Sequence, residues 1–190
     1  VEPEASTLVQ APDHIDQIHT IFELSHSLPF GMKVYVKEHL PMLGMRPPGF
    51  YRRIANLPNV LLVDPWIDSQ ELIKNSRVVL TATGTAAFEA AILGVPSVML
   101  GANFYANMKE GITLRDNHGS MRETLKAAME SEPASDDYLC RFIAILHETT
   151  FPCDSSVLWS RLAHSDCNET RTAGHALADH LLAWKQANRQ

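Results

Sequence analysis

The stretch VVLTATGTAAFEAAILGVPSVML, residues 78–100, decides the fold class of this 190-residue chain. Residues 78–80 and 97–100 are short, apolar, β-favouring runs. Residues 86–93 between them are rich in alanine and helical in pattern, and Gly94 is placed to end that helix. A strand, a turn, a helix and a second strand in close succession predict a βαβ unit with parallel strands.

The same alternation continues on both sides of this stretch. We expect a Rossmann-like, doubly wound parallel sheet in an α/β core over residues 1–118, followed by a helical part of the same domain over residues 119–190. Further strands are predicted at residues 32–36, 60–63 and 112–114. Helices are predicted from an N-cap at Asp13 to residue 28, at 50–56, at 70–75 with Ser69 as N-cap, and at 120–131, 136–148 and 170–188, with a long loop over 149–168.

Composition excludes several classes of function. The net charge of −6 and the pI near 5.8 argue against a nucleic-acid partner, because such binding needs a clustered excess of Lys and Arg. No apolar run approaches the roughly 18 residues of a membrane span, so we expect a cytoplasmic protein and leave peripheral contact with a membrane open. The 3 cysteines and the scattered His and Asp side chains have no ligand spacing, so no metal is expected.

The first residues of the chain form a turn-like string, PEAST at 3–7, with no strand before it. We therefore expect the chain to be a fragment that lacks a preceding part. Pro3 to Thr7 would then follow the first strand of the sheet.

Ligands of open parallel sheets bind beyond the carboxyl ends of the strands, and the polar clusters of this chain fall there. Thr83, Gly84 and Thr85 form a strand-to-helix turn that lets backbone N–H groups and hydroxyls approach a phosphate at the start of a helix. Glu89, about one helical turn further on, is placed to accept hydrogen bonds from ribose hydroxyls. The alternative is a structural turn followed by an ordinary surface glutamate.

Other strand ends carry weaker candidates. His39 is a candidate donor to a phosphate, although most lone histidines have no such role. Six further residues at strand ends are candidates for contacts with the sugar or the base of a ligand. The alternative is that they belong to a frayed chain end, a turn or a helix cap. That group is Glu4, Ser6, Thr7, Lys37, Asp64 and Trp66.

An ordered series of short strings resembles the C-terminal half of capsule polysaccharide biosynthesis proteins. The strings span roughly residues 1–125, and their order is more specific than any one of them. They are PEAST at 3–7, VKEH at 36–39, MLG at 42–44, RP at 46–47, LPNV at 57–60, LIKNS at 72–76, TGTA at 83–86, EA at 89–90, LGVP at 93–96 and FY at 104–105.

The resemblance implies the second domain of a bacterial glycosyltransferase of the GT-B architecture, with the N-terminal domain absent. Its substrates would be a nucleotide sugar, for which a CMP-linked sugar is one candidate, and a saccharide or glycolipid acceptor, with no cofactor. By the same resemblance Glu4 would lie at the sugar and be the candidate catalytic residue, His39, Gly84 and Thr85 at the phosphates, and Glu89 at the ribose. The chain departs from the family pattern at Leu40, where proline usually follows the histidine, which puts the local loop geometry in question.

Two alternatives remain open from the sequence. A nonhydrolysing sugar-nucleotide epimerase shares the architecture and a glycine-rich turn followed by glutamate. A noncatalytic nucleotide-sugar-binding domain would need no acid or base at all.

Overall fold

The computed structural model describes residues 5–116, 119–150, 175, 178–180, 182 and 183. The chain divides into two compact units, residues 1–139 and 140–190. The first unit contains every described strand. In the second unit, the described residues are the end of one long helix, Thr150 directly after it, and helical residues between 175 and 183.

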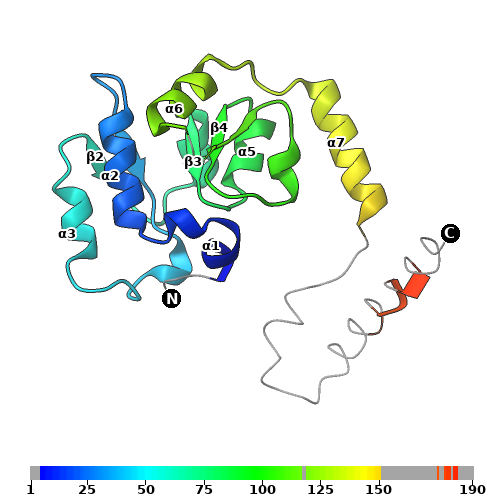
Figure 1. The fold of residues 1–190 in the computed structure, drawn as a ribbon, viewed down its shortest axis with the longest axis horizontal. Helices are drawn as coiled ribbons and strands as arrows, with labels where there is room; N and C mark the ends of the chain where they lie inside the picture. The colour runs from blue at the N-terminus through cyan, green and yellow to red at the C-terminus, as the bar shows by residue number, and fades with distance from the viewer. Residues whose placement is uncertain (1–4, 117–118, 151–174, 176–177, 181, 184–190) are drawn as a thin grey trace. The chain divides into compact units, whose positions relative to one another are not determined.

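Helices and strands alternate along the first unit (Figure 1). The strands are β1 (Val34–Val36), β2 (Val60–Leu62), β3 (Val79–Thr81), β4 (Ser97–Met99) and β5 (Ile112–Leu114). The α-helices are α1 (Ala5–Gln10), α2 (Gln17–Ser27), α3 (Phe50–Ala55), α4 (Ser69–Lys74), α5 (Ala86–Ile92), α6 (Met121–Glu130) and α7 (Asp136–Thr149). Three 3₁₀ turns complete the order: η1 (Pro12–His14), η2 (Leu40–Met42) and η3 (Phe104–Asn107).

The described strands form two parallel sheets, where the sequence predicted one. β1 pairs with β2, with Tyr35 opposite Leu61. β3, β4 and β5 pair in that order, and β4 is the central, fully buried strand. The prediction of an α/β fold with parallel strands is confirmed, and the arrangement is compatible with a Rossmann-like fold.

Helices cover the sheets in two layers. On one side α3 packs on β2, α6 packs on β4 and β5, and α2 packs against both α3 and α6. One apolar core joins this layer to both sheets, and it includes Leu24, Val34, Val98 and Leu125. On the other side α4 and α5 pack together, and Ile73, Ala90 and Val79 form a separate cluster there.

Two N-caps differ from the prediction. Asp16, not Asp13, caps α2, since its carboxylate accepts a hydrogen bond from the His19 N–H at 3.0 Å. Asp13 lies inside η1, because Pro12 fixes the backbone for a 3₁₀ turn before the helix starts. Similarly, Asp68 caps α4 by accepting from the Gln70 N–H at 2.7 Å, and Ser69 is the first residue of the helix.

The start of the chain also differs. Residues 5–7 belong to α1, so the described part of the string at 3–7 is helical and not turn-like. The predicted loop at 149–168 and much of the predicted helix at 170–188 lie outside the described residues, and the described ones between 175 and 183 are helical.

Candidate functional site

The turn after β3 is held by its own side chains. The Gly84 N–H donates a hydrogen bond to the Thr81 Oγ1 at 3.1 Å. A Cβ atom at Gly84 would lie 2.8 Å from the same oxygen, which is closer than real Cβ contacts come. The sequence therefore needs glycine here so that the chain can fold back over Thr81 before α5 begins.

The loop after β4 fixes the middle of this turn. The Tyr105 hydroxyl donates to the Thr83 carbonyl oxygen at 2.8 Å, and the Asn103 amide donates to the same oxygen at 3.1 Å. Asn103 is itself fixed, because its side-chain oxygen accepts from the backbone N–H groups of Tyr105 and Ala106. The turn is thus preorganised by a neighbouring strand end.

Glu89 faces the opening of the turn. The Thr85 hydroxyl donates to the Glu89 Oε1 at 2.7 Å, and Gly84 and Thr85 are exposed. A carboxylate has about four acceptor positions, so this bond leaves Glu89 with capacity for other hydroxyl donors. Burial raises the pKa of the Tyr105 phenol, and the hydrogen bond with Asn103 opposes this shift. The charge of Glu89 raises the same pKa further, so Glu89 is near enough to Tyr105 to interact with it electrostatically.

Two aromatic residues after β4 have different environments. Tyr105 is buried and stacks on Phe88 with ring centroids 5.9 Å apart. Phe104 packs edge-on against Tyr105 at 4.7 Å and remains 60% exposed. Tyr105 therefore belongs to the core that supports the turn, whereas Phe104 offers an apolar surface beside it.

The carboxyl-terminal end of α1 closes against the same strand ends. The Ala102 N–H donates to the Gln10 carbonyl oxygen at 3.3 Å, and the Gly101 N–H donates to the Ala82 carbonyl oxygen at 2.9 Å. Thr7 is buried, 3% exposed, so its side chain belongs to the packing of α1 and does not face solvent. Ser6 lies in the same helix, and Glu4 lies outside the described residues.

His39 follows the carboxyl end of β1 and is exposed. It precedes η2, in which Pro41 stands one residue later than the proline of the family pattern. The backbone N–H of His39 donates to the Glu38 Oε1 at 2.8 Å. A buried carboxylate therefore fixes the backbone of His39 just after the end of β1.

Glu38 is the centre of a buried polar network that the sequence did not predict. Arg46 donates to both of its oxygens at 2.7 Å, and the Tyr51 hydroxyl donates to Oε2 at 3.1 Å. The Arg46 and Glu38 side chains are 5% and 8% exposed. The Arg46 guanidinium also lies over the Phe50 ring, 4.6 Å from its centroid. This network fixes the loop from residue 38 to residue 51, which includes His39.

The surroundings of Glu38 favour its ionised form. Burial raises the pKa of its carboxyl group, but the hydrogen bonds from Arg46 and from the His39 N–H outweigh burial and hold the pKa below its usual value. Burial, together with the hydrogen bond to Glu38, raises the pKa of Tyr51. Both shifts favour the pairing that is seen.

The candidates after β2 are engaged in local structure. The Asp64 carboxylate accepts from the Trp66 N–H at 2.9 Å, which is the turn that the sequence allowed as an alternative. The Trp66 side chain is 75% exposed and available for contact. Lys37 follows β1 and is half-buried. No hydrogen bond joins these residues or His39 to the turn at 81–85 in the described part of the chain.

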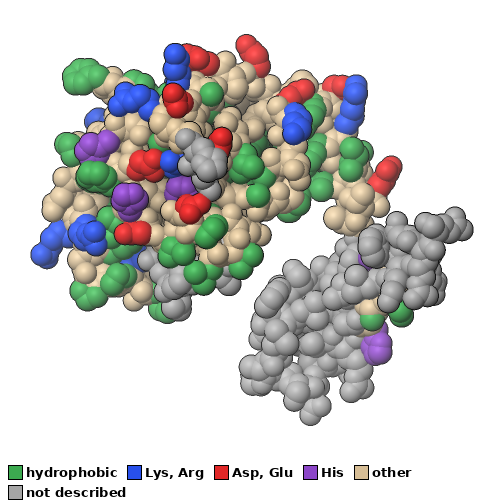
Figure 2. Space-filling view, viewed as in Figure 1, with side chains coloured by type: hydrophobic (Ala, Val, Ile, Leu, Met, Phe, Trp, Pro, Cys, Tyr) green, Lys and Arg blue, Asp and Glu red, His purple; other side chains and the backbone are tan. Residues whose placement is uncertain are grey.

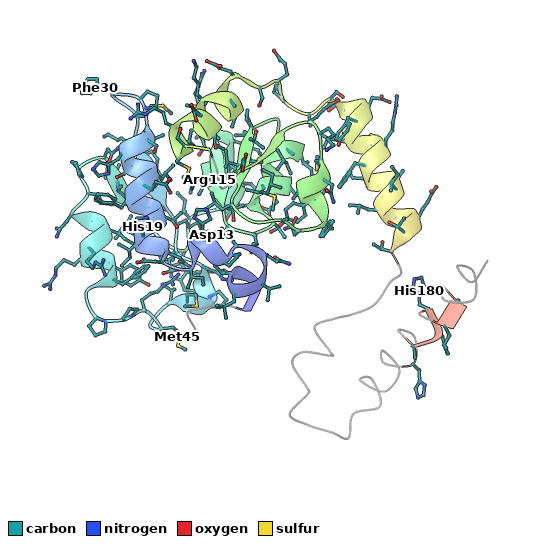
Figure 3. The ribbon with its side chains drawn as sticks, viewed as in Figure 1. Asp13, His19, Phe30, Met45, Arg115 and His180 are labelled. Atoms are coloured by element: carbon teal, nitrogen blue, oxygen red, sulfur yellow. The ribbon has the colours of Figure 1, made fainter. Side chains whose placement is uncertain are left out.

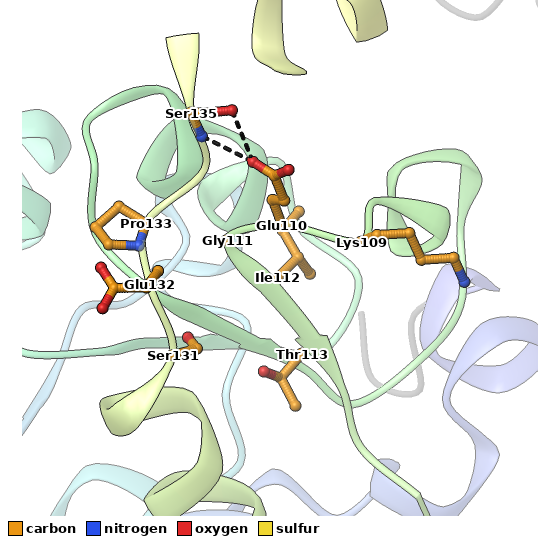
Figure 4. A pocket seen from close by; sticks show the side chains of 9 residues that line it. All are labelled: Lys109, Glu110, Gly111, Ile112, Thr113, Ser131, Glu132, Pro133 and Ser135. Carbon is orange, nitrogen blue, oxygen red and sulfur yellow. Dashed lines mark hydrogen bonds between the residues drawn. The ribbon is translucent and has the colours of Figure 1, made fainter. Parts of the chain in front are cut away.

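A separate hollow of about 510 Å³ lies at the amino end of β5 (Figure 4). Glu110 lines it, but its carboxylate already accepts from the backbone N–H and the hydroxyl of Ser135, both at 2.9 Å. This hollow is at the opposite end of the strands from the turn at 81–85, so it is not part of the candidate site.

The surface carries no charge field of a single sign on the face seen in Figure 2, where acidic and basic side chains are interspersed. Among the described residues, no group of three or more His, Cys, Asp or Glu side chains is arranged to hold a metal ion. In the same residues, no helix has the length and apolar character needed to cross a membrane.

Comparison with known proteins gives no match: no family model fits the chain, and neither the curated proteins nor the solved structures searched contain a significant relative.

Proposed function

We propose that this domain binds the nucleotide-sugar donor of a glycosyltransferase of capsule or surface-polysaccharide synthesis, as the second half of a two-domain GT-B enzyme. The observation that carries the proposal is the preorganised turn after β3. Its Thr83 carbonyl is clamped from the β4 loop, and an exposed Thr85–Glu89 pair opens to solvent beside Phe104. Such convergence at strand carboxyl ends is typical of nucleotide sites in open α/β sheets.

Each group has a role in this proposal. The Thr83 hydroxyl donates to donor phosphates, and the Thr85 hydroxyl does so when it turns away from Glu89. The turn brings the backbone close to these phosphates. Glu89 accepts from the vicinal ribose hydroxyls, since a carboxylate matches two O–H donors. His39 donates to a phosphate from the β1 side, while Glu38 and Arg46 act only by positioning the loop that carries it.

Transfer of the sugar needs more than this domain. Orientation of an acceptor and exclusion of water require a closed cleft, which a single open sheet edge does not provide. We therefore propose that the chain by itself binds a nucleotide and transfers no sugar. Glu4 remains the candidate catalytic residue, and a saccharide or glycolipid is the candidate acceptor. The cytoplasm is the expected location.

Titration calorimetry with CMP, UDP and GDP tests the proposal directly. One of the three is expected to bind, and Glu89→Gln to weaken that binding by about 1–3 kcal/mol, because the amide replaces an acceptor with a donor. Glu132→Gln is the matched control, since Glu132 is exposed and lines the hollow at the other end of β5. His39→Ala should weaken a nucleotide more than the corresponding nucleoside.

The outcomes separate the alternatives. If the folded chain binds none of the three nucleotides at millimolar concentration, or if Glu89→Gln and Glu132→Gln behave alike, the donor site is wrongly assigned. If the full-length protein binds a nucleotide sugar and interconverts its epimers without an acceptor, the epimerase replaces the transferase. Binding without any turnover by the full-length protein would leave the noncatalytic domain.

A further inference from the structure

One histidine of the first unit is buried between a 3₁₀ turn and a helix. His14 is the last residue of η1 and is 7% exposed. Its Nδ1 lies 3.2 Å from the Oγ1 of Thr20 in α2, and Thr20 is buried as well. The Thr20 hydroxyl donates its own proton to the Asp16 carbonyl oxygen at 3.1 Å. His14 is therefore the donor of the other hydrogen bond, with its one ring proton on Nδ1 and none on Nε2.

The surroundings of His14 oppose a second ring proton. Among the described residues, the charged or titratable side chains that act on it are Asp13 on η1, His19 and Glu23 on α2, and Arg115 after β5, whereas α1 carries no such side chain (Figure 3). Burial lowers the pKa of His14, and the positive charge of Arg115 adds to that shift. The carboxylates of Glu23 and Asp13 oppose the shift without reversing it. The neutral imidazole is thus the form that this site favours.

The turn that contains His14 is linked to the carboxyl end of β4. The His14 N–H donates to the Ala11 carbonyl oxygen at 3.0 Å, so η1 follows directly on the end of α1. The last residue of α1, Gln10, accepts a hydrogen bond from the Ala102 N–H at 3.3 Å. A Cβ atom at Gly101 would clash with the same Gln10 carbonyl oxygen, so the two segments are closely packed. Movement of η1 would therefore be transmitted through Gln10 to the loop after β4.

We propose that His14 is a pH-sensitive switch, which keeps α1 and η1 packed on the end of β4 while its imidazole is neutral and releases them when the imidazole is protonated. A proton added at Nε2 places a positive charge in a buried site near Arg115, and opening of η1 lets water solvate that charge. The opening breaks the hydrogen bond from His14 to Thr20 and the bond from Ala102 to Gln10. The switch requires no nucleotide, so it stands or falls apart from the proposed function.

Amide hydrogen exchange of the 190-residue chain, measured by NMR between about pH 7.5 and pH 5, tests the switch. The pKa of His14 is lowered in the folded state, so the switch is closed above the unfolded value of about 6.5 and opens as pH falls toward the folded pKa. After correction for the intrinsic rate, the Ala102 amide should exchange at least about threefold faster at the lower pH. The Leu100 amide, which donates to Thr81 within the sheet, is the internal control and should not change. No acceleration at Ala102, or equal acceleration at Leu100, would overturn the proposal.

Two substitutions separate His14 from the other titrating groups. His14→Asn keeps an N–H donor for Thr20 but cannot gain a proton in this range, so the pH dependence at Ala102 should disappear. His26→Asn is the matched control, because His26 lies on α2 but is exposed, and it should behave as wild type. Equal pH dependence in His14→Asn and wild type refutes the proposal. If His14→Asn does not fold, the His14 ring and the Ala102 amide of wild type should titrate with one midpoint below about 6.5, and different midpoints refute it.

Discussion

Replacing Arg46 with Met is expected to destabilise the first unit strongly. Arg46 supplies two of the hydrogen bonds to Glu38, and both side chains are almost completely buried, at 5% and 8% exposure. Without Arg46 a buried carboxylate keeps only the His39 N–H and the Tyr51 hydroxyl as partners. Breaking one side of a buried ion pair costs about 3–5 kcal/mol, and this is the loss we expect in the free energy of unfolding.

Urea unfolding at pH 7 measures this loss. With a slope of about 2 kcal/mol per molar urea, the midpoint should fall by roughly 1.5–2.5 M. The matched control is Lys126→Met, because the Lys126–Glu130 pair is 4.0 Å apart with both side chains over 60% exposed, at 71% and 66%. Removing such a surface pair should cost about 0.5 kcal/mol or less.

The double variant Glu38→Leu/Arg46→Met and the pH dependence sharpen the test. The double variant should be more stable than Arg46→Met alone, because it leaves no unpaired charge in the interior. The pKa of Glu38 is lowered in the folded state, so its contribution is fully present above the unfolded pKa of about 4.3 and is lost as pH falls through the folded pKa. The difference between wild type and Arg46→Met should therefore shrink below about pH 4. If Arg46→Met costs no more than Lys126→Met, the network does not support the loop.

Two other predictions concern supports of the fold. A Cβ atom added by Gly101→Ala would clash with the Gln10 carbonyl oxygen, so we expect the free energy of unfolding, measured in urea, to fall by about 2–3 kcal/mol. Gly119→Ala is the control and should change it little, because the nearest atom to a Cβ there is 3.5 Å away. Equal effects of the two variants would contradict close packing of α1. Arg115, shown between α2 and the strands in Figure 3, donates to both Glu23 oxygens at 2.9 and 2.6 Å, and these hydrogen bonds lower the pKa of Glu23. Stability from this pair is present above the unfolded pKa and lost as pH falls, so wild type should lose more stability than Glu23→Gln between about pH 5 and pH 3, and identical pH profiles would exclude the pair as a source of stability.

The βαβ unit at 78–100 could be read from the sequence because its signals are local. The two apolar runs, the alanine-rich helix and Gly94 each specify a conformation within a few residues, and the strands and helix lie within one residue of the predicted bounds. Gly94 has φ +71, the left-handed conformation expected after a helix. The cap was wrongly placed at Asp13 because the start of the helix at Asp16 depends on a contact beyond its immediate neighbours, the 3₁₀ turn in which His14 is buried against Thr20.

The supports of the candidate site were hidden for a different reason. Glu38 and Arg46 are separated by a loop rich in proline and glycine, in which no periodicity relates one side chain to another. The clamp on Thr83 comes from Tyr105 and Asn103, on the next strand end. Such contacts follow from strand order, which local propensity does not contain. The residue types of the turn indicated its chemistry, but only the pairing of the strands showed which side chains fix the turn in place.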